Sequence, residues 1–282
     1  MARRQLASDL ERMGLLRGDL LYVHTSMKAI GWVEGGPRAL LEAFLDVLGT
    51  EGTIVAPTHT LSFPGRGAEP YDPAATPTIL GAFPEALRRD PRAHRSGHAS
   101  HSSAGIGKQA AWLAERHDPT NALGYDSPLH RIWRENGKIL LLGVSQTSNT
   151  TIHLGESLAG APYVKAPYDE SWGKDVHALL PGGAIARYRQ TEFPGCSEEF
   201  ARLEPAIDSM AGTRQGFVGN ARSRLMLSRD VVSAAKDMLA VDTMALLCDE
   251  IGCHCCARRK EFLRRLGLAE RDAARRIPPS RK

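Results

Sequence analysis

Apolar runs rich in branched residues alternate along the chain with longer segments whose apolar positions recur every three or four residues. Runs of the first kind are typical of buried strands, and the clearest three read "DLLYVHTS", "GTIVAPTH" and "KILLLGV". Between the first two lies "GGPRALLEAFLDVLG", in which Pro37 can start a helix and Gly49 can stop it. Its apolar stripe consists of Leu40, Leu41, Phe44, Leu45 and Leu48. The pattern predicts a strand, a helix and a second strand in succession.

The same periodicity predicts helices in "TILGAFPEALRRD" and "GKQAAWLAERHD". Helices that alternate with strands cover the faces of a sheet that is parallel at least in part, so we expect an α/β fold. The sheet should be central and mixed, partly parallel, with helices flanking it. The chain has 282 residues, of which 42% are hydrophobic, and this allows one large domain. We place that domain at residues 1–245 and a Cys-rich, basic helical extension at 246–282.

Composition restricts the location and the partners of the protein. The N-terminal "MARRQLASDLERMGLL" lacks an apolar stretch of signal-peptide length, and no window approaches the roughly 20 apolar residues of a membrane span. We therefore expect a cytoplasmic protein without a membrane partner. The net charge of +4 lies mostly in the tail "CCARRKEFLRRLGLAERDAARRIPPSRK", where basic residues are mixed with acidic ones. That mixture does not favour nucleic acid as a partner. The five cysteines are not spaced like a secreted disulfide framework, so reduced thiols are expected.

Two loops suit a ligand that carries phosphate groups. The first, "VHTSMKAIGWVEGG", follows a predicted strand and precedes a predicted helix, and the backbone amides of residues 26–31 could bind phosphate with Lys28 nearby. It contains neither GxGxxG nor GxxxxGK[ST], so no motif supports a nicotinamide or nucleoside triphosphate site. An ordinary strand-to-helix loop remains an alternative.

The second loop, "AHRSGHASHSSAGIG", combines an arginine with several serines and histidines. Arg95 and Ser96 are suited to holding phosphate oxygens. A zinc site is the alternative here, but the histidines have no carboxylate or cysteine partner in helical register; they are His94, His98 and His101.

A further histidine and a carboxylate stand three residues apart in "QTSNTTIHLGE", just after the apolar run "KILLLGV". The residues alone leave two interpretations of His153. It can be a polar histidine of the core, or it can perform proton transfer at the end of a strand.

The chain resembles the aminoglycoside N3-acetyltransferases, the antibiotic N-acetyltransferase family that is distinct from the GNAT acetyltransferases. The resemblance runs from about residue 5 to 240 and rests on the order and spacing of "VHTSMKAIGWVEGG", "GTIVAPTHT", "YDPAATPT", "RSGHASHSSAGIG", "GYDSPLHRIW", "ILLLGV" and "NTTIHLGE". It implies a single domain of the antibiotic N-acetyltransferase type. That domain would bind acetyl-coenzyme A and acetylate the 3-amino group of a 2-deoxystreptamine antibiotic.

The resemblance also implies catalytic residues. The family motif T-x-H-x-x-E falls on Thr151, His153 and Glu156, and its histidine is thought to act as the base. An imidazole has an ordinary pKa of about 6.5 and can take a proton from an amine near neutral pH. The family also supplies a glutamate to support the histidine, here within "GCSEEFARLEPAI", and we expect Glu204 in that role. Glu198 and Glu199 are the alternative positions for this supporting glutamate. Glu156 is expected to have a structural role, and Cys196 is expected to serve packing only.

The binding residues follow from the same resemblance. Coenzyme A would be lined by two sets of positions, Ser26, Met27, Ile30 and Val33 in the first loop and Arg95, Ser96 and Ser103 in the second. The second loop departs from the family, since Ala99 stands in place of a proline and Ser103 in place of an aromatic residue. The acidic insertion that holds the cationic acceptor in many relatives is short here. The remaining acceptor candidates are Glu69, Asp72, Asp169 and Glu170.

The extension contains a CxxC formed by Cys253 and Cys256. Cys248 and either His254 or Cys255 could complete four zinc ligands, but a second well-spaced pair is missing, so we expect unligated thiols and no metal. Two alternatives to the antibiotic acetyltransferase stay open. One is the same enzyme class acting on a metabolite amine, and the other is a non-enzymatic binding protein. A monomer or a homodimer is expected.

Overall fold

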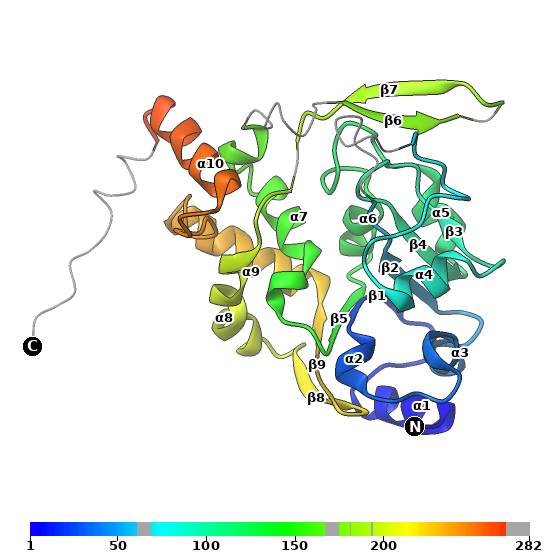
Figure 1. The fold of residues 1–282 in the computed structure, drawn as a ribbon. Coiled ribbons are helices and arrows are strands. Elements are labelled where there is room, and N and C mark those ends of the chain that lie inside the picture. Colours follow the sequence, from blue (N-terminus) through cyan, green and yellow to red (C-terminus); the bar gives the residue numbers. More distant parts are fainter. Residues whose placement is uncertain (61–68, 167–174, 181, 193, 269–282) are drawn as a thin grey trace, which may run out of the picture.

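A mixed seven-stranded sheet organises the protein, whose computed structural model describes residues 1–60, 69–166, 175–180, 182–192 and 194–268. The strand order is β3-β4-β2-β1-β5-β9-β8, and the sheet runs through the middle of the molecule (Figure 1). Strand β1 pairs in parallel with β2 and β5, and the remaining neighbours are antiparallel. The predicted mixed, partly parallel sheet is therefore confirmed. The strands are β1 (Leu20–Thr25), β2 (Thr53–Pro57), β3 (His94–Arg95), β4 (Ser103–Gly107), β5 (Lys138–Leu142), β8 (Arg214–Val218) and β9 (Ala221–Leu227).

Strand β1 divides the interior into two cores because its side chains alternate between the two faces of the sheet. Leu21 and Val23 belong to one apolar cluster, whereas Leu20 and Tyr22 belong to the other. Both faces are covered by helices, which explains why β1, β2 and β5 in the middle of the sheet are apolar runs without polar alternation.

The first face is covered by α1, α3 and α4. Helix α3 begins with a proline in its first turn and ends at Gly49, which has φ of 63°. Left-handed backbone of this kind favours glycine. The proline therefore lies at the start of the helix and the glycine at its end, as the sequence predicted. The elements on this side are α1 (Arg3–Arg12), α2 (Met27–Ile30), α3 (Gly36–Leu48) and α4 (Ala82–Arg88).

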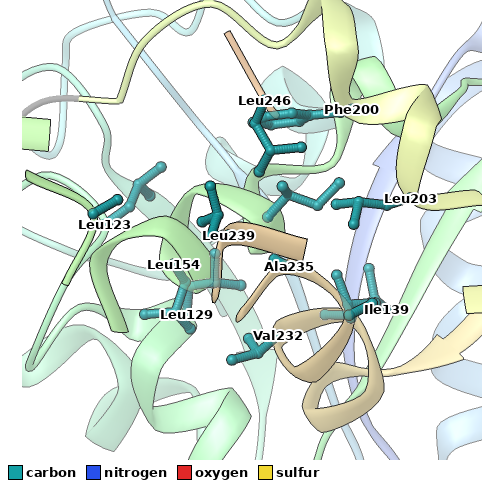
Figure 2. Packing of buried hydrophobic residues seen from close by; sticks show 14 of the residues in the cluster. Leu123, Leu129, Ile139, Leu154, Phe200, Leu203, Val232, Ala235, Leu239 and Leu246 are labelled. Atoms are coloured by element: carbon teal, nitrogen blue, oxygen red, sulfur yellow. The ribbon is translucent and has the colours of Figure 1, made fainter. Parts of the chain in front are cut away.

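The second face carries the helix that contains His153. Helices α7 and α9 pack closely, since a Cβ atom built on Gly155 would lie 2.6 Å from the Cβ of Ala235. Figure 2 shows this core, in which Leu154, Leu239 and Phe200 are labelled. The elements on this side are α5 (Ala110–Glu115), α6 (Pro128–Arg134), η2 (Gln146–Ser148), α7 (Thr150–Leu158), η3 (Pro162–Lys165), η5 (Glu198–Leu203), α8 (Glu204–Asp208) and α9 (Ser228–Val241).

The C-terminal extension packs on the same core. Cys248, Cys256 and Leu263 are buried in the cluster that surrounds α7 and α9, so the proposed boundary at residue 245 does not separate two cores. Helix α10 (His254–Arg265) forms the predicted helical part, and residues 269–282 lie outside the described residues. A two-stranded hairpin of β6 (Asp175–Leu179) and β7 (Ile185–Arg189) stands apart from the main sheet (Figure 1). None of the helices in the described ranges has the length and apolar character needed to cross a membrane.

Candidate active site

A cavity of about 270 Å³ lies beyond the carboxyl ends of the three parallel strands. Ligand sites in open α/β sheets occur at this edge. Its walls come from the segment after β2, from residues 100–101, from the start of α7 and from residues 194–200. His153 is 8% exposed and lines this cavity. The structure thus brings the predicted base to a space that a ligand can enter.

A buried chain of hydrogen bonds fixes the imidazole of His153. Its Nδ1 lies 2.5 Å from Oε2 of Glu156, and the hydroxyl of Tyr163 donates to Oε1 of Glu156 at 2.7 Å. His153 and Glu156 are three residues apart on α7 and therefore share one face of the helix. With Nδ1 held by the carboxylate, Nε2 is the nitrogen left for a substrate.

Phe200 and Arg259 pack against this chain of hydrogen bonds, one on the ring of His153 and the other on the ring of Tyr163. The ring of Phe200 meets the His153 ring edge-on at a centroid distance of 4.7 Å. Burial, followed by the nearby Glu156 carboxylate, raises the pKa of Tyr163 well above its ordinary value, so its hydroxyl stays a donor. The guanidinium of Arg259, from α10, lies 5.2 Å from the centre of the Tyr163 ring.

Glu204 does not have the position expected of it. Its carboxylate accepts a hydrogen bond at 2.9 Å from Nη1 of Arg224, a β9 residue that also pairs with Asp208. The competing Glu199 pairs with Arg202 on its own short helix. The carboxylate that contacts His153 is that of Glu156, because the three-residue spacing on α7 places it against the imidazole.

The second loop is occupied by internal contacts, contrary to the expected contact with coenzyme A. The guanidinium of Arg95 donates to the carbonyls of Thr76 and Thr58 at 2.6 and 2.8 Å and lies 5.0 Å from the Tyr71 ring centre. Burial lowers the pKa of Arg95. These contacts anchor residues 71–76 against the sheet, and they use donors that a phosphate would need.

Ser96 and Ser103 are also buried. The Ser96 hydroxyl lies 3.0 Å from Nδ1 of His117 and accepts a hydrogen bond from the Ser103 amide at 3.0 Å. The Ser103 hydroxyl lies 3.1 Å from the hydroxyl of Tyr22. Both serines therefore connect β3 and β4 to the interior of the sheet, and their contact with coenzyme A stays a prediction.

The first loop is divided between core and surface. Ile30 is 0% exposed and Val33 4% exposed, and both belong to the apolar cluster under the loop. Ser26 caps the short helix α2 by accepting a hydrogen bond from the Ala29 amide at 3.3 Å. Only Ser26 and Met27 of the four predicted positions are half-buried, and they remain candidates for contact with coenzyme A.

The structure describes two of the four predicted acceptor residues. Glu69 is exposed, and Asp72 accepts a hydrogen bond from the Ala74 amide at 2.8 Å within a turn. Asp169 and Glu170 lie outside the described residues. The sequence analysis missed a carboxylate close to the predicted base. Glu192 lines a small space together with His153 and Glu156.

Two histidines with lowered pKa values line the cavity. The rings of His59 and His101 lie 4.5 Å apart, and both residues line its wall. Burial lowers the pKa of His59 to about 3 and that of His101 well below its ordinary value. It lowers the pKa of His24 to about 3 and that of His117 to about 4. A wall of uncharged imidazoles can accept hydrogen bonds without repelling a cationic ligand.

Comparison with known proteins places these residues in a family context. A model described as aminoglycoside 3-N-acetyltransferase matches residues 22–240. Aminoglycoside N(3)-acetyltransferase IV from Salmonella sp is 33% identical over 248 residues, which cover 87% of this chain and 90% of the relative. The aminoglycoside N(3')-acetyltransferase-like protein YokD of Bacillus subtilis is 29% identical over 255 residues, covering 83% and 90%.

Solved structures agree in fold. The apoenzyme of aminoglycoside acetyltransferase AAC(3)-IVa has a TM-score of 0.77 at 32% identity, covering 92% of this chain and 96% of that one. A mutant of that enzyme in complex with a gentamicin has the same TM-score at 31% identity and the same coverage. A binary complex of AAC-IIIb with CoASH has a TM-score of 0.74 at 26% identity, covering 85% and 96%.

The buried histidines predict acid sensitivity. A histidine of the unfolded chain titrates at about 6.5, whereas His24 and His59 titrate at about 3 in the fold. The unfolded chain therefore binds more protons below pH 6.5, and stability falls as the pH decreases from 6.5 towards 3. At pH 5.5 each such histidine should reduce the free energy of unfolding by about 1.4 kcal/mol relative to pH 7.5. Urea denaturation at both pH values measures this.

Two variants make the measurement specific. His24→Gln should reduce the difference between pH 7.5 and 5.5 by about 1.4 kcal/mol. His94→Gln, which replaces an exposed histidine, should leave that difference unchanged. Equal unfolding free energies of the wild-type protein at the two pH values would contradict the lowered pKa values of His24 and His59.

Proposed function

This chain belongs to the aminoglycoside 3-N-acetyltransferase family, and on that premise we propose that it transfers acetyl from acetyl-coenzyme A to aminoglycosides. The group acetylated is the 3-amino group of the 2-deoxystreptamine ring. One observation carries the proposal: His153, oriented by Glu156, lines a cavity at the carboxyl edge of the parallel strands. Relatives solved with CoASH and with a gentamicin support the two ligand classes.

His153 acts as the general base in the proposed reaction. The acceptor amine attacks the thioester carbonyl carbon, which forms the C–N bond and places negative charge on the carbonyl oxygen. Nε2 of His153 takes the proton from the attacking nitrogen. The C–S bond then breaks, and the thiolate of coenzyme A takes the proton from the imidazolium. No covalent enzyme intermediate is needed, because the thioester is already activated.

Glu156 orients the base in this scheme. Its carboxylate accepts the Nδ1 hydrogen of His153, which fixes the tautomer and stabilises the imidazolium while it carries the second proton. The carboxylate is 1% exposed, so water does not weaken this interaction. Tyr163 donates to the other oxygen and keeps the carboxylate in position.

Thiol release from acetyl-coenzyme A tests the activity, with gentamicin, kanamycin, neomycin and apramycin assayed separately. We expect release with at least one of them, and NMR of the product should place the acetyl group on the 3-amino nitrogen. Because the acceptor is polycationic, its KM should rise with ionic strength as exposed charges are screened. Release only with uncharged or single-amine metabolites would instead support the second acceptor class.

His153→Ala tests the base. The variant should bind acetyl-coenzyme A with unchanged affinity in calorimetry, while kcat falls by roughly 10²- to 10⁴-fold. The loss should shrink at high pH, where more of the acceptor amine is already deprotonated. His94→Ala, at an exposed histidine of β3, is the matched control and should keep wild-type kcat. A folded His153→Ala enzyme with wild-type kcat would make His153 a core histidine only.

Glu156→Gln and Glu204→Gln distinguish the two candidate partners of the histidine. Glu156→Gln keeps the size of the side chain but removes its charge, so kcat should fall by roughly 10- to 10³-fold. Glu204→Gln weakens the contact with Arg224 and should lower the free energy of unfolding by about 1 kcal/mol. It should change kcat by less than about twofold. The reverse order of kcat losses would return the supporting role to Glu204.

A further inference from the structure

Four cysteine sulfurs converge beside the wall of the cavity. They belong to Cys196, Cys248, Cys253 and Cys256, and all four Sγ atoms lie within 4.8 Å of one another. Cys196 precedes η5, Cys248 follows α9, and the other two stand at the start of α10. In the part of the chain that the structure describes, this is the one group of side chains with the geometry of a metal site.

The spacing of the sulfurs fits a single small ion. Four sulfurs at about 2.3 Å from a tetrahedral zinc ion are separated from one another by about 3.8 Å. The sulfurs of Cys196 and Cys248 lie 3.7 Å apart. Cys248 and Cys256 are buried, and Cys196 and Cys253 are half-buried, so the centre of the group is screened from water. We propose that these four cysteines bind a structural zinc ion.

The surroundings suit the charge of such a site. One Zn²⁺ with four thiolates carries two negative charges, and Cys253 and Cys256 lie at the N-terminus of α10, where the helix dipole is positive. The ammonium of Lys260 donates to the carbonyl of Cys248 at 2.6 Å. The amide of Glu198 donates to Sγ of Cys196 at 3.5 Å, the kind of hydrogen bond that stabilises a ligand sulfur.

The ligand set differs from the one considered from sequence. His254 and Cys255 stand beside the CxxC in sequence, but both are exposed. Their place is taken by Cys196, which lies 52 residues before Cys248 and which the sequence analysis assigned to packing. The missing partner of the CxxC is therefore a distant cysteine and not a neighbouring one.

The zinc ion would connect the extension to the active-site wall. Pro194, Gly195 and Ser197, which flank or adjoin Cys196, line the cavity. Phe200 follows on η5 and contacts the His153 ring. On the other side of the site, α10 supplies Arg259 to the Tyr163 ring. Zinc binding would thus fix both the 194–200 wall and the helix that backs Tyr163.

Metal analysis of the full chain tests the site directly. Cells are grown in zinc-containing medium and the protein is purified without chelator. Elemental analysis by inductively coupled plasma mass spectrometry should then find about one zinc ion per chain. Replacement of the metal with Co²⁺ should produce the strong visible bands of a tetrahedral cobalt thiolate. A zinc content near zero, iron in place of zinc, or two disulfides in the purified protein would each overturn the proposal.

Single replacements identify the ligands. Cys196→Ser and Cys256→Ser should reduce bound zinc by at least about tenfold at equal free zinc. Cys255→Ser and His254→Ala are the matched controls, because they alter exposed neighbours, and both should keep full zinc content. Loss of zinc in His254→Ala with retention in Cys196→Ser would refute this ligand set. If a ligand variant does not fold, the cobalt spectrum of the wild-type protein decides.

A kinetic comparison tests the connection to the wall. Zinc removal by a chelator should raise the acceptor KM several-fold, and added zinc should restore it. The control variant Cys255→Ser keeps the ligands, so its KM should rise and recover to the same extent as that of the wild-type enzyme. Metal content is measured independently of activity, so an inactive enzyme that still holds zinc would contradict the proposed function and not the zinc site.

Discussion

The hydrogen bond between Glu156 and His153 is the interaction on which the site depends. A buried carboxylate is costly unless its oxygens are paired, and here one oxygen meets the imidazole while the other accepts from Tyr163. His153 lies one turn before Glu156 on α7, and Tyr163 lies on the short helix η3 that follows, so the three side chains come from one continuous segment. The rest of the local structure serves to keep water away from this pair and to leave Nε2 directed at the cavity.

The enclosure comes from parts of the chain that are distant in sequence. Gly155, which lies between His153 and Glu156 in the sequence, lets α7 lie against Ala235 of α9. A larger residue there would separate the two helices. Phe200 closes one side of the imidazole, and α10 closes the far side of Tyr163 through Arg259. The C-terminal extension is therefore part of the support of the active site, although the family model itself matches only residues 22–240.

Local signals in the sequence predicted the elements, and contacts between distant segments account for the errors. The three parallel strands, α3 with its proline start and glycine stop, and the position of His153 all follow from patterns within a few residues. Glu204 contacts Arg224 and not the histidine in the structure, and hydrophobic pattern alone could not show this because Arg224 lies on a strand twenty residues later. The internal acceptors of Arg95 could not be read from the sequence for the same reason, since they belong to residues 58 and 76.

The histidines illustrate why chemistry is harder to infer than fold. A group of them in "AHRSGHASHSSAGIG" suggests metal or phosphate chemistry by composition. In the structure His98 is buried and His101 is half-buried, and burial lowers the pKa of both well below the ordinary value. What distinguishes His153 from them is a charged partner. His153 has the Glu156 carboxylate within hydrogen-bonding distance, whereas burial lowers the pKa of His98 and His101 and disfavours their charged form. The contact with a carboxylate is therefore the observation on which we propose His153, and not a neighbouring histidine, as the base.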